Sequence, residues 1–131
     1  MTPHMKEMSR LTGIQIEEMK ENPVRTAREF ADQYGVVCVL KDAATVIAGR
    51  DGKTFVNGSG TPAMAKGGSG DVLTGVIAGL VALGLEESDA AALGVYVHGL
   101  AGEVAEKHFG VHGVLAGEIA DCLSEVYRDG I

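Results

Sequence analysis

Residues 57–75 read NGSGTPAMAKGGSGDVLTG, and this stretch indicates both the fold and a binding site. A glycine-rich loop at residues 67–70 leads directly into an apolar segment that we expect to form a helix over residues 71–83. Backbone N–H groups of such a loop converge with the helix N-terminus, where partial positive charge favours an anion such as phosphate. Glycine suits the loop because side chains would keep an anion away from the backbone. The stretch therefore predicts an anion-binding loop.

Asp71 follows this loop directly and has two interpretations. Beside a bound polyanion, its carboxylate can act as a base toward a substrate hydroxyl. Alternatively, Asp71 only caps the helix and the loop is only a flexible turn. The local pattern leaves both open.

Three other glycine-rich motifs are excluded by single residues. A Walker loop carries Lys after its glycines, whereas Lys66 precedes them. The dinucleotide fingerprint needs a small residue where Leu73 stands. A nucleophile elbow needs glycine where Asp71 stands, so Ser69 is a poor candidate for an acyl-transfer nucleophile.

The segment before this stretch predicts helices that alternate with strands. Two short helices are expected at residues 6–11, closed by Gly13, and at residues 15–20. A third begins after Asn22, a capping residue followed by proline, and ends at Gly35. Its apolar residues recur at helical spacing: Val24, Ala27, Phe30, Ala31 and Tyr34.

The strands are expected in the middle of the chain. Residues 36–40 are apolar without alternation, which is typical of a strand buried on both faces of a parallel sheet and reached through a β-α-β connection. Residues 45–48 and 53–57 are predicted to pair as a hairpin, because the Asp-Gly pair in residues 49–52 favours a tight turn.

The C-terminal half is predicted to be helical. Helices are expected over residues 71–83 up to Gly84, over residues 88–108 with Ser88 as cap, and over about residues 115–128. The histidines here do not suggest a metal site. His98 lies in an apolar helical run and is expected to be a hydrogen-bonded core residue, while His108 and His112 flank Gly110 and so do not share a helix face.

Composition limits the function classes. The chain has 131 residues, enough for one domain, and a net charge of −7 that argues against a nucleic acid or an anionic membrane as the main partner. No apolar run is long enough to cross a bilayer. Cys38 and Cys122 are expected to be buried free thiols, and with no secretion signal at the N-terminus the protein is expected to be cytoplasmic.

Four motifs in order then resemble one family: Thr2-Pro3-His4, residues 41–45 after a buried strand, residues 57–65, and residues 67–75. Together they are similar to the ADP- or ATP-dependent NAD(P)H-hydrate dehydratases, the YjeF-related carbohydrate kinases of the ribokinase-like superfamily. The resemblance implies a ribokinase-like three-layer α/β/α fold. Because Thr2-Pro3-His4 resembles a point near the middle of the family's domain, residues 1–131 are expected to form a single partial domain, the C-terminal portion of the fold with a β-hairpin and a helical C-terminal half.

The resemblance also implies an activity. In that family the nucleotide phosphorylates the hydroxyl of hydrated NADH or NADPH, and elimination of phosphate restores the cofactor, which is a metabolite repair reaction. By the same resemblance Asp71 is the catalytic base, and His4 and Asp71 face the hydrated substrate. The nucleotide-binding residues implied are Lys41, Asp42, Ala43, Ala44, Thr45, Gly67, Gly68, Ser69 and Gly70. Mg²⁺ is expected with the nucleotide phosphates and not in a cage of protein ligands.

Three residues depart from the family pattern: Asp42 stands where glycine is usual, and Lys66 and Ser69 stand where threonine is usual. A carboxylate at Asp42 would repel phosphates, and the Lys66 ammonium could offset that repulsion.

Two alternatives remain open. One is a kinase of the same superfamily that phosphorylates a sugar or a vitamin alcohol. The other is a truncated half-domain that binds nucleotide without activity of its own. We also expect homo-oligomers, since a central strand at residues 36–40 would have too few preceding strands to cover both of its edges.

Overall fold

The computed structural model describes residues 1–130 and divides into two compact units. The first comprises Met1–Asn57 with Glu86–Ala92, and the second comprises Gly58–Leu85 with Leu93–Ile131. Each unit has its own buried apolar cluster.

The sheet of the first unit has three strands in the order β1-β2-β3: β1 (Cys38–Leu40), β2 (Val46–Ala48) and β3 (Thr54–Val56). The hairpin prediction is confirmed, with Ile47 opposite Phe55. In its turn the Gly49 N–H donates to the Lys53 carbonyl at 2.8 Å, and Gly52 adopts φ +83°. A positive φ is costly for residues with a side chain, which is why the Asp-Gly pair was informative.

The expectation of a parallel sheet around residues 36–40 is wrong for the strand that follows, because β1 pairs antiparallel with β2. The parallel neighbour of β1 is instead the start of the chain. The Val39 N–H donates to the Met1 carbonyl at 2.8 Å, and the Lys41 N–H donates to the Pro3 carbonyl at 2.9 Å. Both edges of β1 are therefore hydrogen-bonded, and the predicted uncovered edge at this strand does not exist. An unbroken apolar run indicates that a strand is buried on both faces, but it does not indicate whether the neighbouring strands run parallel or antiparallel to it.

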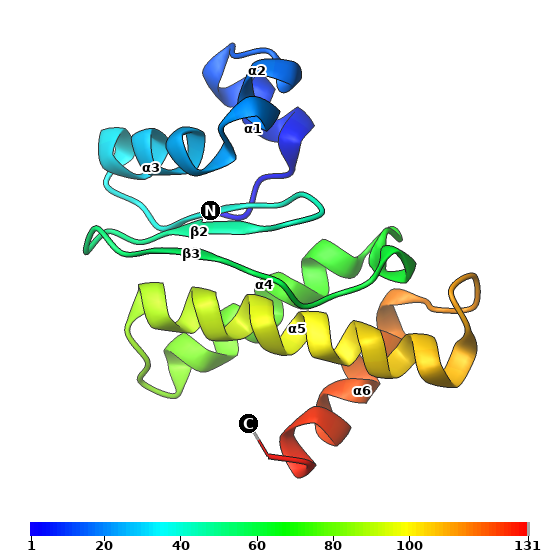
Figure 1. Ribbon diagram of the computed structural model, residues 1–131. Coiled ribbons are helices and arrows are strands. Elements are labelled where there is room, and N and C mark those ends of the chain that lie inside the picture. Colours follow the sequence, from blue (N-terminus) through cyan, green and yellow to red (C-terminus); the bar gives the residue numbers. More distant parts are fainter. Residues whose placement is uncertain (131) are drawn as a thin grey trace. The chain divides into compact units, whose positions relative to one another are not determined.

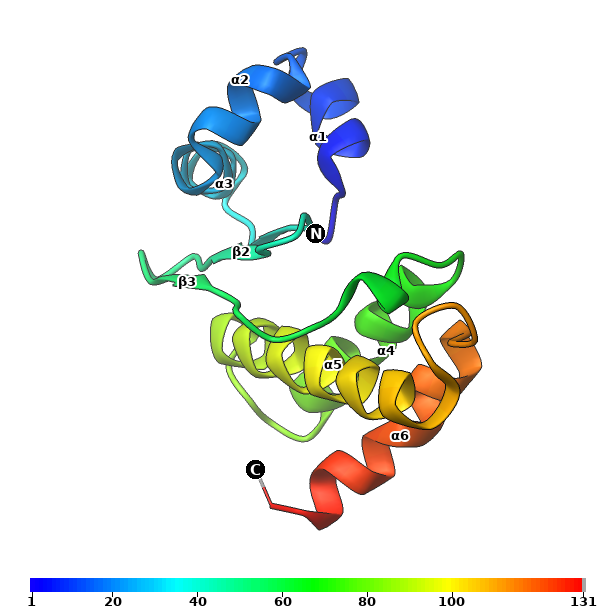
Figure 2. The same ribbon diagram turned by 45° about the vertical axis from the view of Figure 1, so that its right-hand side comes forward.

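Three helices connect the N-terminal segment to β1, as the predicted crossover requires: α1 (Met5–Thr12), α2 (Ile16–Glu21) and α3 (Pro23–Tyr34). Figures 1 and 2 show them on the same face of the sheet. Asn22 caps α3 by accepting from the Arg25 N–H at 3.0 Å, and Gly35 ends it in the left-handed region. Of its five apolar residues at helical spacing, Val24 and Tyr34 are exposed and the other three are buried.

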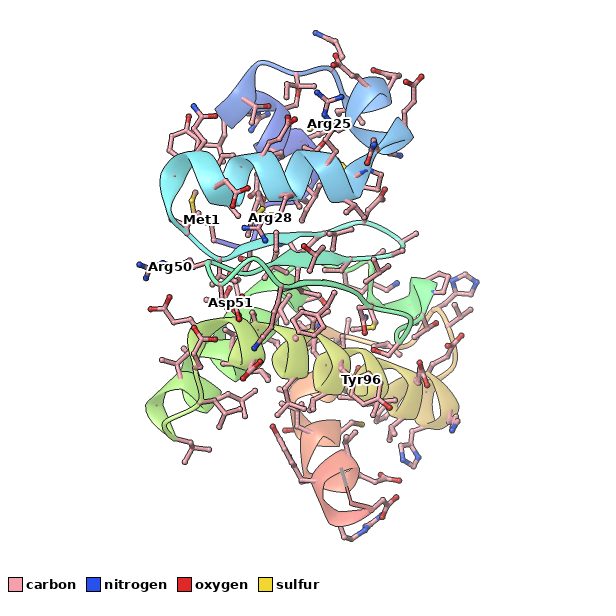
Figure 3. The ribbon with its side chains drawn as sticks, turned by 60° about the vertical axis from the view of Figure 1, so that its left-hand side comes forward. Met1, Arg25, Arg28, Arg50, Asp51 and Tyr96 are labelled. Atoms are coloured by element: carbon pink, nitrogen blue, oxygen red, sulfur yellow. The ribbon has the colours of Figure 1, made fainter. Side chains whose placement is uncertain are left out.

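Arg28 fixes α3 to the hairpin. Its guanidinium donates to the Gly49 carbonyl at 2.5 Å and to the Lys53 carbonyl at 3.1 Å, and it pairs with Asp32 on the same helix. Figure 3 shows the Arg28 side chain extending from α3 toward the sheet. The turn between β2 and β3 is thus held from α3 as well as by its own hydrogen bonds.

The second unit is helical, with η1 (Pro62–Met64), α4 (Ser69–Ala82), most of α5 (Glu87–Phe109) and α6 (Ala116–Arg128). Small side chains dominate its core, which allows the helices to pack closely. The buried residues are Ala63, Val97, Ala101, Ala105, Val114, Ile119, Cys122 and Val126.

The start of α5 differs from the prediction. Ser88 is not the cap, because its N–H donates to the Glu86 carboxylate at 2.8 Å and its side chain is buried. A methyl group on Gly49 would collide with the Ser88 hydroxyl, so the hairpin turn passes directly over this residue. A local signal for a cap cannot reveal that the side chain is enclosed by a distant turn.

Both cysteines are free and buried, as predicted. Burial raises the pKa of the Cys38 thiol from 9.0 to about 11. Along residues 1–130, no helix is both long enough and apolar enough to cross a membrane.

Candidate functional site

The glycine-rich loop takes its shape from Gly68. This residue is the N-cap of α4 with φ +89°, a left-handed conformation that strongly favours glycine. A methyl group added there would lie 3.2 Å from the Ala116 Cβ, so the loop also packs closely against the start of α6. Both observations favour glycine at this position.

The loop presents unpaired N–H groups, as the sequence predicted. The Ser69 N–H donates to the Lys66 carbonyl at 3.3 Å, and the Asp71 N–H donates to the Gly68 carbonyl at 3.1 Å. Within the described part of the chain, the N–H groups of Gly67, Gly68 and Gly70 have no acceptor. Unpaired donors at the start of a fourteen-residue helix form a favourable place for an anion.

Asp71 is not the N-cap of α4. It is the third residue of the helix, its side chain is exposed, and across residues 1–130 its carboxylate has no hydrogen-bond or ion-pair partner. The interpretation of Asp71 as only a cap is therefore wrong. A solvated carboxylate beside unpaired N–H groups can accept a proton from a hydroxyl brought to the loop.

Ser69 points into the protein. Its side chain is 7% exposed, and its Oγ lies 3.5 Å from Nε2 of His98 on α5. His98 is itself 7% exposed, which confirms the prediction of a core histidine with a hydrogen-bond partner. The Ser69 hydroxyl is thus directed at the core and away from the open face of the loop.

His4 lies in the first unit, where it caps α1. Its Nδ1 accepts from the Glu7 N–H at 3.1 Å, and the Glu7 carboxylate accepts from the His4 N–H at 2.8 Å. This backbone hydrogen bond lowers the pKa of Glu7. Because Nδ1 is an acceptor, the neutral ring carries its proton on Nε2.

Residues 41–45 lie beside His4, since His4 and Lys41 form a parallel bridge. Asp42, Ala43 and Ala44 form an exposed bend, and the Thr45 hydroxyl donates to the Asp42 carbonyl at 3.4 Å. Exposure of Asp42 places its charge in water, where its repulsion of a phosphate is strongly screened. The predicted site residues therefore form two groups, one around His4 in the first unit and one around Asp71 in the second.

Sequence reasoning missed the residues that support the stretch before the loop. The Glu103 carboxylate accepts from the Gly60 N–H at 2.8 Å, and the Ser59 hydroxyl donates to the Tyr96 carbonyl at 2.9 Å. Methyl groups on Gly99 or Gly102 would collide with this segment, with Ser59 and Met64 respectively. Two glycines three residues apart on one helix were the available signal for such a close approach.

In residues 1–130 no group of three or more His, Cys, Asp and Glu side chains could hold a metal ion. His108 instead pairs with Glu125 on α6 at 3.0 Å. The donors that the loop offers are N–H groups, which suit phosphate oxygens and not a bare cation.

This fold and loop define a ribokinase-like α/β protein. A ribokinase-like superfamily protein from Enterococcus faecalis superposes with a TM-score of 0.82 at 33% identity, covering 97% of this chain and 43% of that one. The ADP/ATP-dependent NAD(P)H-hydrate dehydratase from Bacillus subtilis, co-crystallised with ATP and Mg²⁺, superposes with a TM-score of 0.93 at 38% identity, covering 98% of this chain and 46% of that one.

The sequence comparisons agree. The bifunctional NAD(P)H-hydrate repair enzyme of Moorella thermoacetica is 45% identical over 129 residues, which are 98% of this chain and 24% of the relative. The Carb_kinase family model, described as NAD(P)H-hydrate dehydratase, matches residues 1–125. The chain belongs to this family, and it spans half or less of the length of these relatives.

Proposed function

We propose that the protein of which this chain forms at least part dehydrates hydrated NADH and NADPH at the expense of ADP or ATP. The observation that carries the proposal is the exposed, unpaired Asp71 carboxylate in the first turn of α4, next to the unpaired N–H groups of Gly67, Gly68 and Gly70. A base beside an anion site is what phosphorylation of a hydroxyl requires.

In the proposed reaction, Asp71 accepts the proton of the substrate hydroxyl while the hydroxyl oxygen attacks the terminal phosphorus of the nucleotide. The bond from that phosphorus to the bridging oxygen breaks, and AMP or ADP leaves. The loop N–H groups stabilise negative charge on the transferred phosphoryl group. Loss of phosphate with a proton from the adjacent ring carbon then restores the double bond of NADH or NADPH.

The remaining site residues are assigned by family membership. We assign the hydrated substrate to His4 and Asp71 and the adenine nucleotide to residues 41–45 and 67–70, within one partial domain over residues 1–131. His4 would contact the substrate through Nε2, which lies 3.5 Å from the Glu7 carboxylate, since Nδ1 already caps α1. Mg²⁺ would enter with the nucleotide phosphates and neutralise part of their charge. Two buried free thiols suit a reducing compartment such as the cytoplasm.

The test is a steady-state assay with hydrated NADH and either ADP or ATP, on this chain and on a form extended to the length of its relatives. Formation of NADH together with inorganic phosphate supports the proposal. A phosphorylated product that accumulates without NADH would indicate a small-molecule kinase. Binding of ADP, detected by amide chemical shifts of Gly67, Gly68 and Gly70, with no turnover in either form would indicate a nucleotide-binding module.

A further inference from the structure

His98 is a buried polar residue that the proposed reaction does not use. It lies on α5, and its Nε2 is 3.5 Å from the Oγ of Ser69. Both side chains are only 7% exposed. A polar pair enclosed in this way is costly to separate, because neither group regains water when the contact is lost.

Ser69 connects this buried contact to the anion loop. It is the first residue of α4, its own N–H donates to the Lys66 carbonyl at 3.3 Å, and the next two residues are Gly70 and Asp71. A shift of Ser69 therefore moves both the loop donors and the carboxylate. Close packing of Gly68 on Ala116 fixes the loop from the opposite helix, α6.

We propose that His98 is a positioning residue that, through Ser69, holds the first turn of α4 so that the unpaired N–H groups and the Asp71 carboxylate keep one fixed arrangement. The role in nucleotide chemistry rests on the proposed function, whereas the positioning of the loop does not. The arrangement matters because displacement of a reacting group by about 1 Å can cost about 100-fold in rate.

Hydrogen exchange of the ligand-free chain tests the positioning directly. The Asp71 and Val72 N–H groups both donate to the Gly68 carbonyl, at 3.1 and 3.2 Å, so their exchange reports the integrity of the first turn. The variants are His98→Leu, Ser69→Ala, the double variant, and His98→Gln, whose amide can occupy the place of Nε2. His108→Leu is the matched control, since His108 is exposed on the same helix.

We expect each single variant to accelerate exchange of these two amides by about 2- to 10-fold, the range for loss of one hydrogen bond. The double variant should be no faster than the faster single variant, and His98→Gln and His108→Leu should resemble the unaltered chain. Two results would overturn the proposal. One is a double variant in which the two single accelerations of exchange multiply, and the other is unaltered exchange of the Asp71 and Val72 amides in the single variants. If His98→Leu does not fold, Ser69→Ala decides alone, because it removes the same hydrogen bond: unaltered exchange of the Asp71 and Val72 amides in that variant would overturn the proposal.

ADP titration of the same proteins separates the two proposals. If ADP binds, His98→Leu and Ser69→Ala should weaken the affinity by a similar factor, and the combined variant by no more. If ADP binds neither this chain nor the extended form while the exchange results hold, the proposed function fails and the positioning role stands. If ADP binds and exchange is unaltered, the positioning role fails and the nucleotide site stands.

Discussion

Gly68 determines the shape of the loop because its backbone is left-handed and its Cα faces Ala116. We predict that Gly68→Ala lowers the free energy of unfolding by about 1–2 kcal/mol, the cost of a left-handed conformation for a residue with a Cβ. Thermal denaturation measures the change. Gly67→Ala is the control, since a methyl group at Gly67 meets nothing within 4 Å and should have a much smaller effect.

Asp71 is the proposed base, and its exposed carboxylate makes no contact on which folding depends. Asp71→Asn should therefore leave thermal stability nearly unchanged while it lowers kcat by about 100- to 10,000-fold, the usual contribution of a general base. Steady-state dehydration of hydrated NADH by the extended form is the measurement. Asp121→Asn, an exposed aspartate on α6, should keep full activity, and an active Asp71→Asn enzyme would remove Asp71 from the mechanism.

Helix α5 supports the segment that leads to the loop, mainly through Glu103 and Gly60. We predict that Glu103→Ala lowers the free energy of unfolding by about 0.5–1.5 kcal/mol, since the Gly60 N–H loses its acceptor. Glu103→Gln should recover most of this, because its carbonyl oxygen can still accept. Glu106→Ala, three residues further along α5, serves as control in the same urea titration. Equal losses at the two positions would show that the Gly60 contact contributes nothing.

Strand β1 buries the Cys38 thiol, and burial raises its pKa to about 11. The folded state therefore holds the proton more tightly than the unfolded state, whose thiol titrates near 9.0. The contribution of the Cys38 thiol to the free energy of unfolding is therefore fully present below pH 9.0 and is lost as the pH rises toward 11. We predict that urea unfolding shows a falling free energy across this range and that Cys38→Ala reduces the slope. Cys122→Ala should reduce the slope less, because Cys122 is less buried than Cys38.

At the scale of the whole molecule, the strand within residues 1–130 that we expect to pair with another chain is β3 and not β1. Strand β3 is last in the sheet order, and its three residues are exposed, with Val56 at 60% and Phe55 at 37%. An apolar strand edge of this kind favours pairing with a second copy.

We predict that the chain self-associates through β3 at micromolar concentration and that Val56→Lys shifts it to the monomer. Light scattering measures the mass. Val81→Lys, at an exposed apolar position on α4, is the control and should leave association unchanged. A monomeric unaltered chain would contradict the prediction.

The sequence by itself determined the local elements, including the glycine-rich segment that leads into α4. Caps such as Asn22, stops such as Gly35 and the Asp-Gly turn depend on φ preferences and hydrogen bonds between residues close in the chain, so they can be read without a fold. The same holds for glycines before an apolar helix, although α4 begins at Ser69, two residues earlier than the sequence predicted.

The tertiary structure decided the contacts between distant residues. Pairing of Val39 with Met1, the inward turn of Ser69 toward His98, and burial of Ser88 beneath the hairpin each join residues at least 29 positions apart. Burial on both faces gives β1 the same apolar sequence whether its neighbours run parallel or antiparallel. A serine before a helix likewise has the same local preference whether its hydroxyl caps the helix or faces the core, and only the folded chain shows which group lies within hydrogen-bonding distance.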